Sequence, residues 1–187
     1  MGLRGTTHLE LFFHDVHLDE HCLLGEEGKG LRLALETLGR IRLAHVGARA
    51  VGMAQRALNT MTEHCRYREQ FGRPIGDFQF MQQMLADSAI ELNAGRLMIM
   101  HAAWRIDQGL PARDNIAMVK VHASETLNRI ADRAVQIFGG AGFSKAGPVE
   151  RFYRDSRIFR IYDGTSEIHR GNVARSILKS GMDFLEF

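Results

Sequence analysis

The strongest periodic pattern in the sequence is an apolar stripe that runs from Phe80 to Gln108. Its members follow one another at alternating steps of four and three residues, which places them on one face of a helix. They are Met81, Leu85, Ser88, Leu92, Gly95, Ile99, Ala102 and Ile106. Ser88 and Gly95 are weakly apolar, but both are small enough to let a neighbouring helix approach. We therefore predict one long helix that packs within a bundle.

Two further stretches are predicted to be helical. From Leu31 to about Arg66 the apolar residues form one stripe, and the middle is rich in Gly and Ala, which allow close helix packing. Another stripe runs from Ile116 to Ile137. Only three prolines interrupt 187 residues, and short connections favour antiparallel neighbours. The sequence thus predicts a mostly α fold: an antiparallel up-and-down four-helix-type bundle with a short N-terminal β remnant.

The β remnant is expected within residues 7–18, where Leu9, Leu11 and Phe13 alternate as in a strand. Four potential metal ligands lie nearby, namely His14, His17, His21 and Cys22. Their spacing is loose, and imidazoles on a strand of period two point to different faces. We therefore expect a solvated loop there and no metal site.

Composition excludes several classes of function. The net charge is +2 with basic and acidic residues interleaved, so nothing indicates binding to nucleic acid or to a membrane surface. No apolar run is long enough to span a bilayer. Cys22 and Cys65 are isolated, which predicts neither a disulfide framework nor a thiolate zinc site and fits a reducing, intracellular compartment.

The chemistry-bearing stretch runs from Arg157 to Arg175, where Asp163 sits on a turn broken by Gly164. Apolar residues precede this turn, and Gly164, Thr165 and Ser166 are typical of a helix N-cap. A carboxylate among apolar groups that faces free backbone N–H donors can act as a general base. The alternative is that Asp163 only caps the following helix.

Two glycine-containing loops are weaker candidates. Residues 67–79 contain Gly72, Pro74 and Gly76 together with Arg68 and Arg73, and such arginine-bearing loops suit phosphate binding. Residues 136–143 are glycine-rich, which a helix C-cap followed by a turn explains fully. Three arginines also lie along the first predicted helix, where a solvated or ion-paired face is the default for each; they are Arg40, Arg42 and Arg49.

Three of these segments together resemble the acyl-CoA dehydrogenase family. IYDGTSEIHR at 161–170 is similar to the family's end-of-chain signature, in which the acid before glycine is the catalytic base. REQFGRPI at 68–75 and QIFGGAGF at 136–143 are similar to its other two signatures. Phe13 to Gly30 resembles the passage from the family's middle β domain into its helical domain.

The resemblance implies two parts and a reaction. Residues 1–27 would be the tail end of the middle β domain, and 28–187 the C-terminal helical bundle domain. The protein would be an FAD-dependent enzyme that desaturates an acyl-CoA thioester between its α and β carbons. Asp163 would remove the α-proton while a β-hydride moves to the flavin. A homodimer or homotetramer that passes electrons to electron-transfer flavoprotein is implied, in the cytoplasm or in the mitochondrial matrix of a eukaryote.

The resemblance also assigns ligand contacts. Tyr162 and Gly164 would line the substrate site, and Arg42 would contact coenzyme A, although the first helix is one residue longer than the common pattern and leaves the register of Arg42 open. The residues implied to contact FAD, some of them across a subunit interface, are Arg68, Gln70, Phe71, Gln136, Gly139, Gly140, Thr165 and Glu167.

Two departures from the family pattern leave alternatives open. Asp163 replaces the usual Glu and has a shorter reach, and relatives that oxidise nitroalkanes also use Asp, so a nitroalkane-oxidase-like flavin oxidase is a second hypothesis. Some members place the base on the first helix, but Ile41, Arg42 and Leu43 offer no carboxylate there. The N-terminal helical domain and most of the middle domain are absent, so a non-catalytic bundle fragment or assembly subunit is a third hypothesis.

Overall fold

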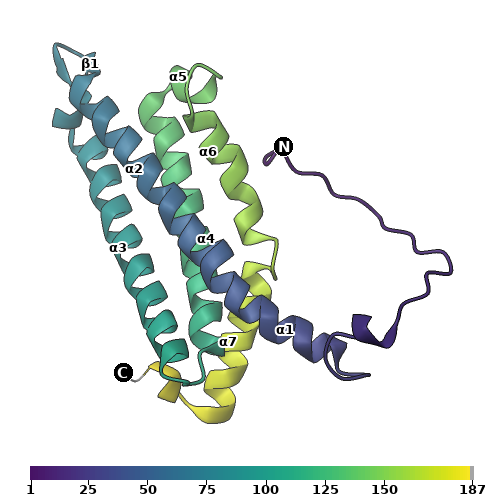
Figure 1. Ribbon diagram of the computed structural model, residues 1–187. Coiled ribbons are helices and arrows are strands. Elements are labelled where there is room, and N and C mark those ends of the chain that lie inside the picture. Colours follow the sequence, from purple (N-terminus) through teal and green to yellow (C-terminus); the bar gives the residue numbers. More distant parts are fainter. Residues whose placement is uncertain (186–187) are drawn as a thin grey trace.

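The computed structural model describes residues 1–185, most of which are helical (Figure 1). The helices in chain order are η1 (Glu20–Cys22), α1 (Gly30–Ile41), the π-helical η2 (Arg42–Ala48), α2 (Arg49–Tyr67), η3 (Ile75–Asp77), α3 (Gln79–Asp107), α4 (Arg113–Phe138), α5 (Gly140–Phe143), α6 (Val149–Ser156), η4 (Arg157–Arg160), α7 (Ser166–Ser180) and η5 (Asp183–Leu185). The strands are β1 (Glu69–Gln70) and β2 (Arg73–Pro74). The predicted mostly α bundle is confirmed.

Helix α4 lies at the centre of the bundle. Helices α2, α3, α6 and α7 all pack against it (Figure 1). Its predicted apolar stripe is buried, with Leu127, Ile130 and Ala134 fully inaccessible to solvent. The stripe of α3 faces the same core, where Ser88 and Leu92 are buried. The small residues of the stripes thus serve close approach between helices, as predicted.

Helices α1 and α2 form one continuous helical rod through the π-helical segment η2 (Figure 1). A π turn holds more residues than an α turn, and η2 carries these wider turns without a break in the rod. At Gly47 within η2 a Cβ atom would lie 2.7 Å from Val119 Cγ1, so this side of the rod touches α4 closely. Helix α1 buries none of its own residues.

Two segments differ from their predicted conformations. Residues 7–18 have no assigned strand and run as an open loop of chain, with Leu9, Leu11 and Phe13 exposed (Figure 1). A strand needs a neighbour to satisfy its backbone groups, and residues 1–185 provide none for this segment. Conversely, the predicted loop 67–79 contains an antiparallel hairpin, in which β1 pairs with β2 around Phe71 and Gly72, both at positive φ.

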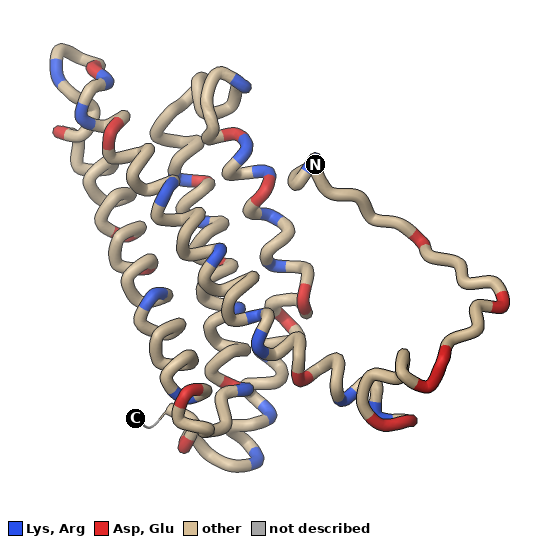
Figure 2. The backbone as a smooth tube through the Cα atoms, viewed as in Figure 1, with Lys and Arg blue, Asp and Glu red and all other residues tan. Residues whose placement is uncertain are grey.

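The surface of the bundle carries mixed charge. Basic and acidic residues are interspersed along the helices (Figure 2). Within residues 1–185, no helix combines the length and apolar character that crossing a bilayer requires. In the same part of the chain, no group of three or more His, Cys, Asp or Glu side chains could hold a metal ion.

One lysine is buried in this core. Lys120 on α4 is 0% exposed, and its Nζ has no hydrogen-bond partner among the residues that the structure describes. Burial lowers the pKa of Lys120 from its ordinary 10.5 to about 8, although nearby carboxylates, Asp163 foremost, oppose the change. The charged ammonium is therefore less stable here than in water.

We predict that replacing Lys120 by Met removes a pH-dependent penalty on stability. The unfolded lysine keeps its proton up to about pH 10.5, whereas the folded lysine releases it near pH 8. The free energy of unfolding of the wild type should therefore rise relative to that of Lys120→Met as pH increases through this window, by up to roughly 3 kcal/mol. Urea titrations of both proteins at several pH values would measure the difference, and a difference that stays constant would contradict the prediction.

Candidate active site

Asp163 occupies a left-handed turn between η4 and α7. Its φ is +55° and that of Gly164 is +91°, so two successive residues adopt a conformation that most side chains disfavour. At Gly164 a Cβ atom would lie 2.8 Å from His169 Nε2, so only glycine fits there. The helix itself is capped by Thr165, whose hydroxyl accepts a hydrogen bond from the Ile168 N–H at 3.3 Å. The alternative that Asp163 serves only as the cap is therefore wrong.

Two side chains hold the backbone of this turn. Arg42 Nε donates to the Asp163 carbonyl oxygen at 2.8 Å, and His169 Nε2 donates to the same oxygen at 3.0 Å. Because a carbonyl can only accept, the proton of the His169 ring lies on Nε2. Burial lowers the pKa of His169, which favours this neutral form. Segments far apart in the sequence, η2 and α7, thus fix one peptide unit.

The carboxylate itself is largely withdrawn from water. The Asp163 side chain is 20% exposed, and its Oδ2 lies 3.7 Å from His45 Nδ1. Among the charged neighbours of the buried Lys120, Asp163 has the largest effect. Arg42, which holds the carbonyl, adds a third basic group. The acid therefore lies among three basic side chains that come from η2 and α4.

Tyr162 forms the apolar flank of the turn. Its ring meets the rings of Phe159 and His45 edge to face, with centroids 5.2 and 5.8 Å apart. Burial raises the pKa of Tyr162 to about 12, so the phenol keeps its proton at neutral pH. Its hydroxyl oxygen has no hydrogen-bond partner within residues 1–185. Tyr162 thus presents a neutral donor beside Asp163.

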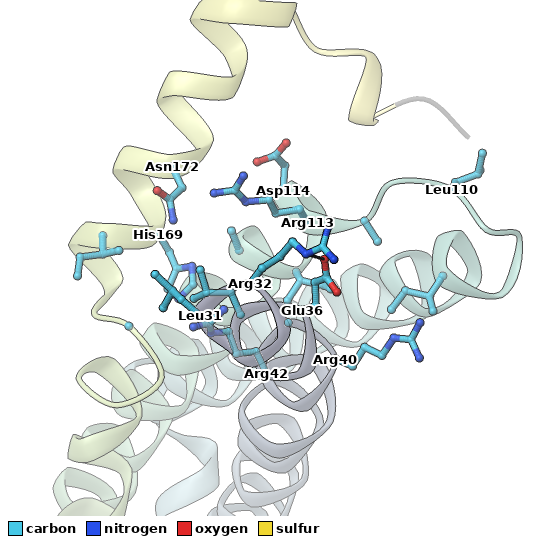
Figure 3. Close-up of a pocket in the computed structure, with 18 of the residues that line it drawn as sticks. Leu31, Arg32, Glu36, Arg40, Arg42, Leu110, Arg113, Asp114, His169 and Asn172 are labelled. Carbon is cyan, nitrogen blue, oxygen red and sulfur yellow. Dashed lines mark ion pairs between the residues drawn. The ribbon is translucent and has the colours of Figure 1, made fainter. Parts of the chain in front are cut away.

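A pocket of about 810 Å³ opens beside the turn, between α1, the start of α4 and α7 (Figure 3). Gly164, Arg42 and His169 lie on its wall. Its other basic residues are Arg32, Arg40 and Arg113, and its acidic ones are Glu36 and Asp114. Its apolar lining consists of Leu31, Leu35, Ile106, Leu110, Ile116 and Ile168, with smaller residues between them. An apolar pocket edged by guanidinium groups suits a ligand that combines an apolar chain with anionic groups.

Sequence reasoning identified this pocket only in part. Of the three predicted substrate contacts, Arg42 and Gly164 line it, whereas Tyr162 is not among its lining residues. Arg40, interpreted as part of a solvated or ion-paired face, also lines it, and Arg113 was not singled out. Arg113 follows a turn some 70 residues beyond Arg42, so no local pattern links the two. Their proximity depends on how α1 and α4 pack.

Six of the predicted FAD contacts lie at the opposite end of the bundle. The hairpin that carries Arg68, Gln70 and Phe71, and the turn at α5 that carries Gly139 and Gly140, lie at the same end, away from α1 and α7 (Figure 1). The rings of His64 and Phe138, which flank these two segments, stack with centroids 3.9 Å apart. Gln136 is in the last turn of α4.

The structure thus separates the predicted FAD contacts into two groups. Thr165 and Glu167 stay with Asp163 at the start of α7, whereas the other six are at the hairpin end of the bundle. Phe71 is 94% exposed there, with its ring edge-on to Phe78. The Arg73 guanidinium carbon lies over the Phe78 ring, 4.2 Å from its centroid.

Comparisons with known proteins agree with this architecture. The sequence profile described as "Acyl-CoA dehydrogenase, C-terminal domain" matches residues 28–178. The acryloyl-CoA reductase (NADH) of Anaerotignum propionicum is 41% identical over 96% of this chain and 45% of its own length. The mitochondrial short-chain specific acyl-CoA dehydrogenase of Bos taurus is 42% identical over 96% of this chain and 43% of its own.

Solved structures give the same result. Butyryl-CoA dehydrogenase from Megasphaera elsdenii superposes with a TM-score of 0.86 and 38% identity, over 89% of this chain and 43% of that one. The chain therefore spans less than half the length of the relatives that it matches. The matched profile and these similarities show that the chain belongs to the acyl-CoA dehydrogenase family, with residues 28–178 forming its C-terminal domain.

Proposed function

We propose that this chain supplies the catalytic base and parts of the FAD and substrate sites of an acyl-CoA dehydrogenase that desaturates an acyl-CoA thioester between its α and β carbons. The observation that carries the proposal is the Asp163 turn. Its carboxylate does not cap the helix, its carbonyl is fixed by two hydrogen bonds, and it adjoins a pocket with an apolar lining and a basic rim.

Asp163 would act as the general base that removes the α-proton of the thioester. Its carboxylate is mostly shielded from water, so it is little occupied by solvent hydrogen bonds. The developing enolate oxygen needs a positioned donor. The Asp163 N–H makes no backbone hydrogen bond among the turn and loop contacts of residues 1–185, so it is available for that role.

Tyr162 and Gly164 would line the substrate site on either side of the base. The phenol of Tyr162 keeps its proton beside the base, and Gly164 lies on the pocket wall. Arg42 would contact coenzyme A while it holds the Asp163 carbonyl, because it lies on both the turn and the pocket wall. Arg32, Arg40 and Arg113 extend this basic rim for phosphate groups.

The hairpin end of the bundle has the chemistry that an FAD nucleotide requires. Phe71 offers an exposed ring for stacking, Arg68 a guanidinium for phosphate, and Gln136 an amide for hydrogen bonds. Gly139 and Gly140 have open space where side chains would be. When bound, FAD supplies the hydride acceptor. Since Thr165 and Glu167 lie elsewhere, we propose that each FAD is contacted by two copies of the chain.

Residues 1–27 would belong to the middle β domain of the family. Their exposed apolar side chains, at Leu9, Leu11 and Phe13 among others, support this because they lack the sheet on which such residues pack. A homodimer or homotetramer, with electron-transfer flavoprotein as electron acceptor, completes the proposal.

Two hypotheses stand as alternatives to this proposal. Aspartate at position 163, where the family usually has glutamate, favours a nitroalkane-oxidase-like enzyme, because a more acidic substrate carbon tolerates a less well-placed base. A non-catalytic bundle fragment or assembly subunit is the third hypothesis. The predictions below separate these possibilities.

Self-association should be detectable in the chain alone. Apolar residues lie exposed on two long helices, at Leu97 and Met100 on α3 and at Ile168, Ile177 and Leu178 on α7. Such surfaces are normally covered by a partner. Sedimentation at micromolar concentration should therefore show dimers or larger species, and a monomer with full helical content would contradict this.

Replacing Asp163 by Asn should abolish most of the turnover of the complete FAD-containing enzyme. The amide keeps the volume of the side chain but cannot take the α-proton, so kcat should fall by roughly 10²- to 10⁴-fold. The flavin absorbance should persist, because the turn is held through the backbone carbonyl. Asp132→Asn, at an exposed position on α4, is the matched control. Unchanged turnover in Asp163→Asn would remove Asp163 from the mechanism.

Asp163→Glu should separate the two enzymatic functions. In an acyl-CoA site the longer acid should keep part of the activity, because the family commonly uses glutamate at this place. In a nitroalkane site built around the shorter acid, the displaced oxygen should cost roughly a hundredfold in rate. Assays with short acyl-CoA thioesters and with nitroethane would distinguish these outcomes, and inactivity with both substrates in the wild type would favour the non-catalytic subunit.

A further inference from the structure

We propose that His45 is a positioning residue for the catalytic base: its Nδ1–H holds one oxygen of the Asp163 carboxylate and leaves the other free for the substrate proton. The inference rests on the proposed function of Asp163. It concerns a residue outside the three motifs that identify the family, and it follows from the contacts around the π-helical segment.

The π-helical segment aims two side chains at the same turn. Arg42 reaches the carbonyl of Asp163, and His45, three residues later, reaches its carboxylate, with Nδ1 3.7 Å from Oδ2. The backbone and the side chain of the base are thus approached from one short stretch of helix. Single-turn π segments occur frequently at functional sites.

The neighbours of His45 determine which ring nitrogen carries the proton. Arg49 NH1 lies 3.3 Å from His45 Nε2. A guanidinium can only donate, so Nε2 must accept and the proton of the neutral ring must sit on Nδ1. That N–H faces the carboxylate of Asp163. The ring plane is further set by Tyr162, whose ring it meets at 83°.

The surrounding charges allow this pairing. On its own helical rod His45 lies beside Arg49, and Arg42 is one turn earlier. On the opposite side the His45 ring faces Asp163 and Tyr162. Lys120 on α4 and His169 on α7 interact with Asp163 from the interior. Among these neighbours Asp163 carries the carboxylate, so the His45 ring has one anionic partner.

The contact between His45 and Asp163 explains how an aspartate, whose side chain is shorter than that of glutamate, can be placed accurately. At 3.7 Å the two atoms are beyond hydrogen-bond distance, and a small rotation of either side chain closes the gap. With one oxygen held, the other has a fixed direction toward the substrate carbon. Accuracy matters because a misplacement of about 1 Å costs roughly a hundredfold in rate. His45 is 48% exposed at its side chain, so substitutions there leave the core packing intact.

The first test needs no activity. Long-range ¹H–¹⁵N correlation spectra of the chain, at a pH where the ring is neutral, should show the Nδ1–H tautomer for His45, assigned by its absence in His45→Asn. In Asp163→Asn the ¹⁵Nδ1 resonance should shift, while that of His101 on α3 stays in place as the control. An Nε2–H tautomer, or a resonance indifferent to Asp163, would overturn the proposal.

The second test uses the complete enzyme and three variants. Asn places its amide nitrogen two bonds from Cβ, where Nδ1 was, whereas Gln places it three bonds away, where Nε2 was. We expect His45→Asn to keep kcat within a few-fold, and His45→Gln and His45→Leu to lose roughly ten- to a hundredfold in kcat with KM little changed. Equal losses in the Asn and Leu variants, or a loss confined to KM, would overturn the proposal.

A double mutant separates this inference from the proposed function. If His45 acts through Asp163, then His45→Leu should cause no further loss of kcat in the Asp163→Asn background. Additive losses would show that His45 acts independently and would overturn the proposal. If Asp163→Asn alone leaves turnover unchanged, the proposed function fails instead, and the tautomer spectra still report whether the pair exists.

Discussion

The structure depends on one peptide oxygen that accepts two hydrogen bonds. The carbonyl of Asp163 receives Arg42 Nε from the first helical rod and His169 Nε2 from α7. The Arg42 bond spans 121 residues of sequence, so the two bonds together connect η2 with the start of α7. Two residues at positive φ precede α7, and such a strained turn persists only where its surroundings fix it. The geometry of the Asp163 turn is therefore a product of tertiary packing.

The same interactions set the electrostatics of the site. Arg42 and Lys120 bring positive charge to Asp163 from two directions, and the buried lysine lacks a hydrogen-bond partner of its own within residues 1–185. A protein core bears such a cost only where other interactions offset it. Here the unfavourable burial of Lys120 is partly offset by the three carboxylates around it. Stability and site electrostatics thus depend on the same buried charge.

Sequence periodicity was sufficient to predict the bundle, because each long helix repeats its apolar residues often enough to define a face. The stripes of α3 and α4 follow directly from that regularity, whereas the central position of α4 appears only in the structure. The hairpin at Glu69–Pro74 was not predicted, since its two-residue strands are too short for any alternation to appear. Apolar residues alternate along segment 7–18 as they do in a strand, but residues 1–185 offer no sheet with which this segment could pair.

The site could be predicted only where its reactive residues are contiguous in the sequence and form a motif. Asp163, Gly164 and Thr165 are contiguous, so their turn could be recognised, although the cap belongs to Thr165. Three other residues could not be recognised from the sequence, because each comes near Asp163 or its pocket only through helix packing; they are His45, Lys120 and Arg113. A lone His, Lys or Arg on a predicted helix carries no signal of its own.

The π-helical segment has one further consequence, for the angular relation between α1 and α2. Each residue of an α-helix advances the chain by about 100° around the axis, so one extra residue rotates everything before it by that angle. Because the π turns of η2 hold extra residues within the rod, α2 packs against α4 while α1 presents Leu31 and Leu35 to the pocket. In a purely α-helical rod of the same sequence α1 would turn another face to the pocket, so the surface that Leu31 and Leu35 present to a ligand depends on the π geometry of η2.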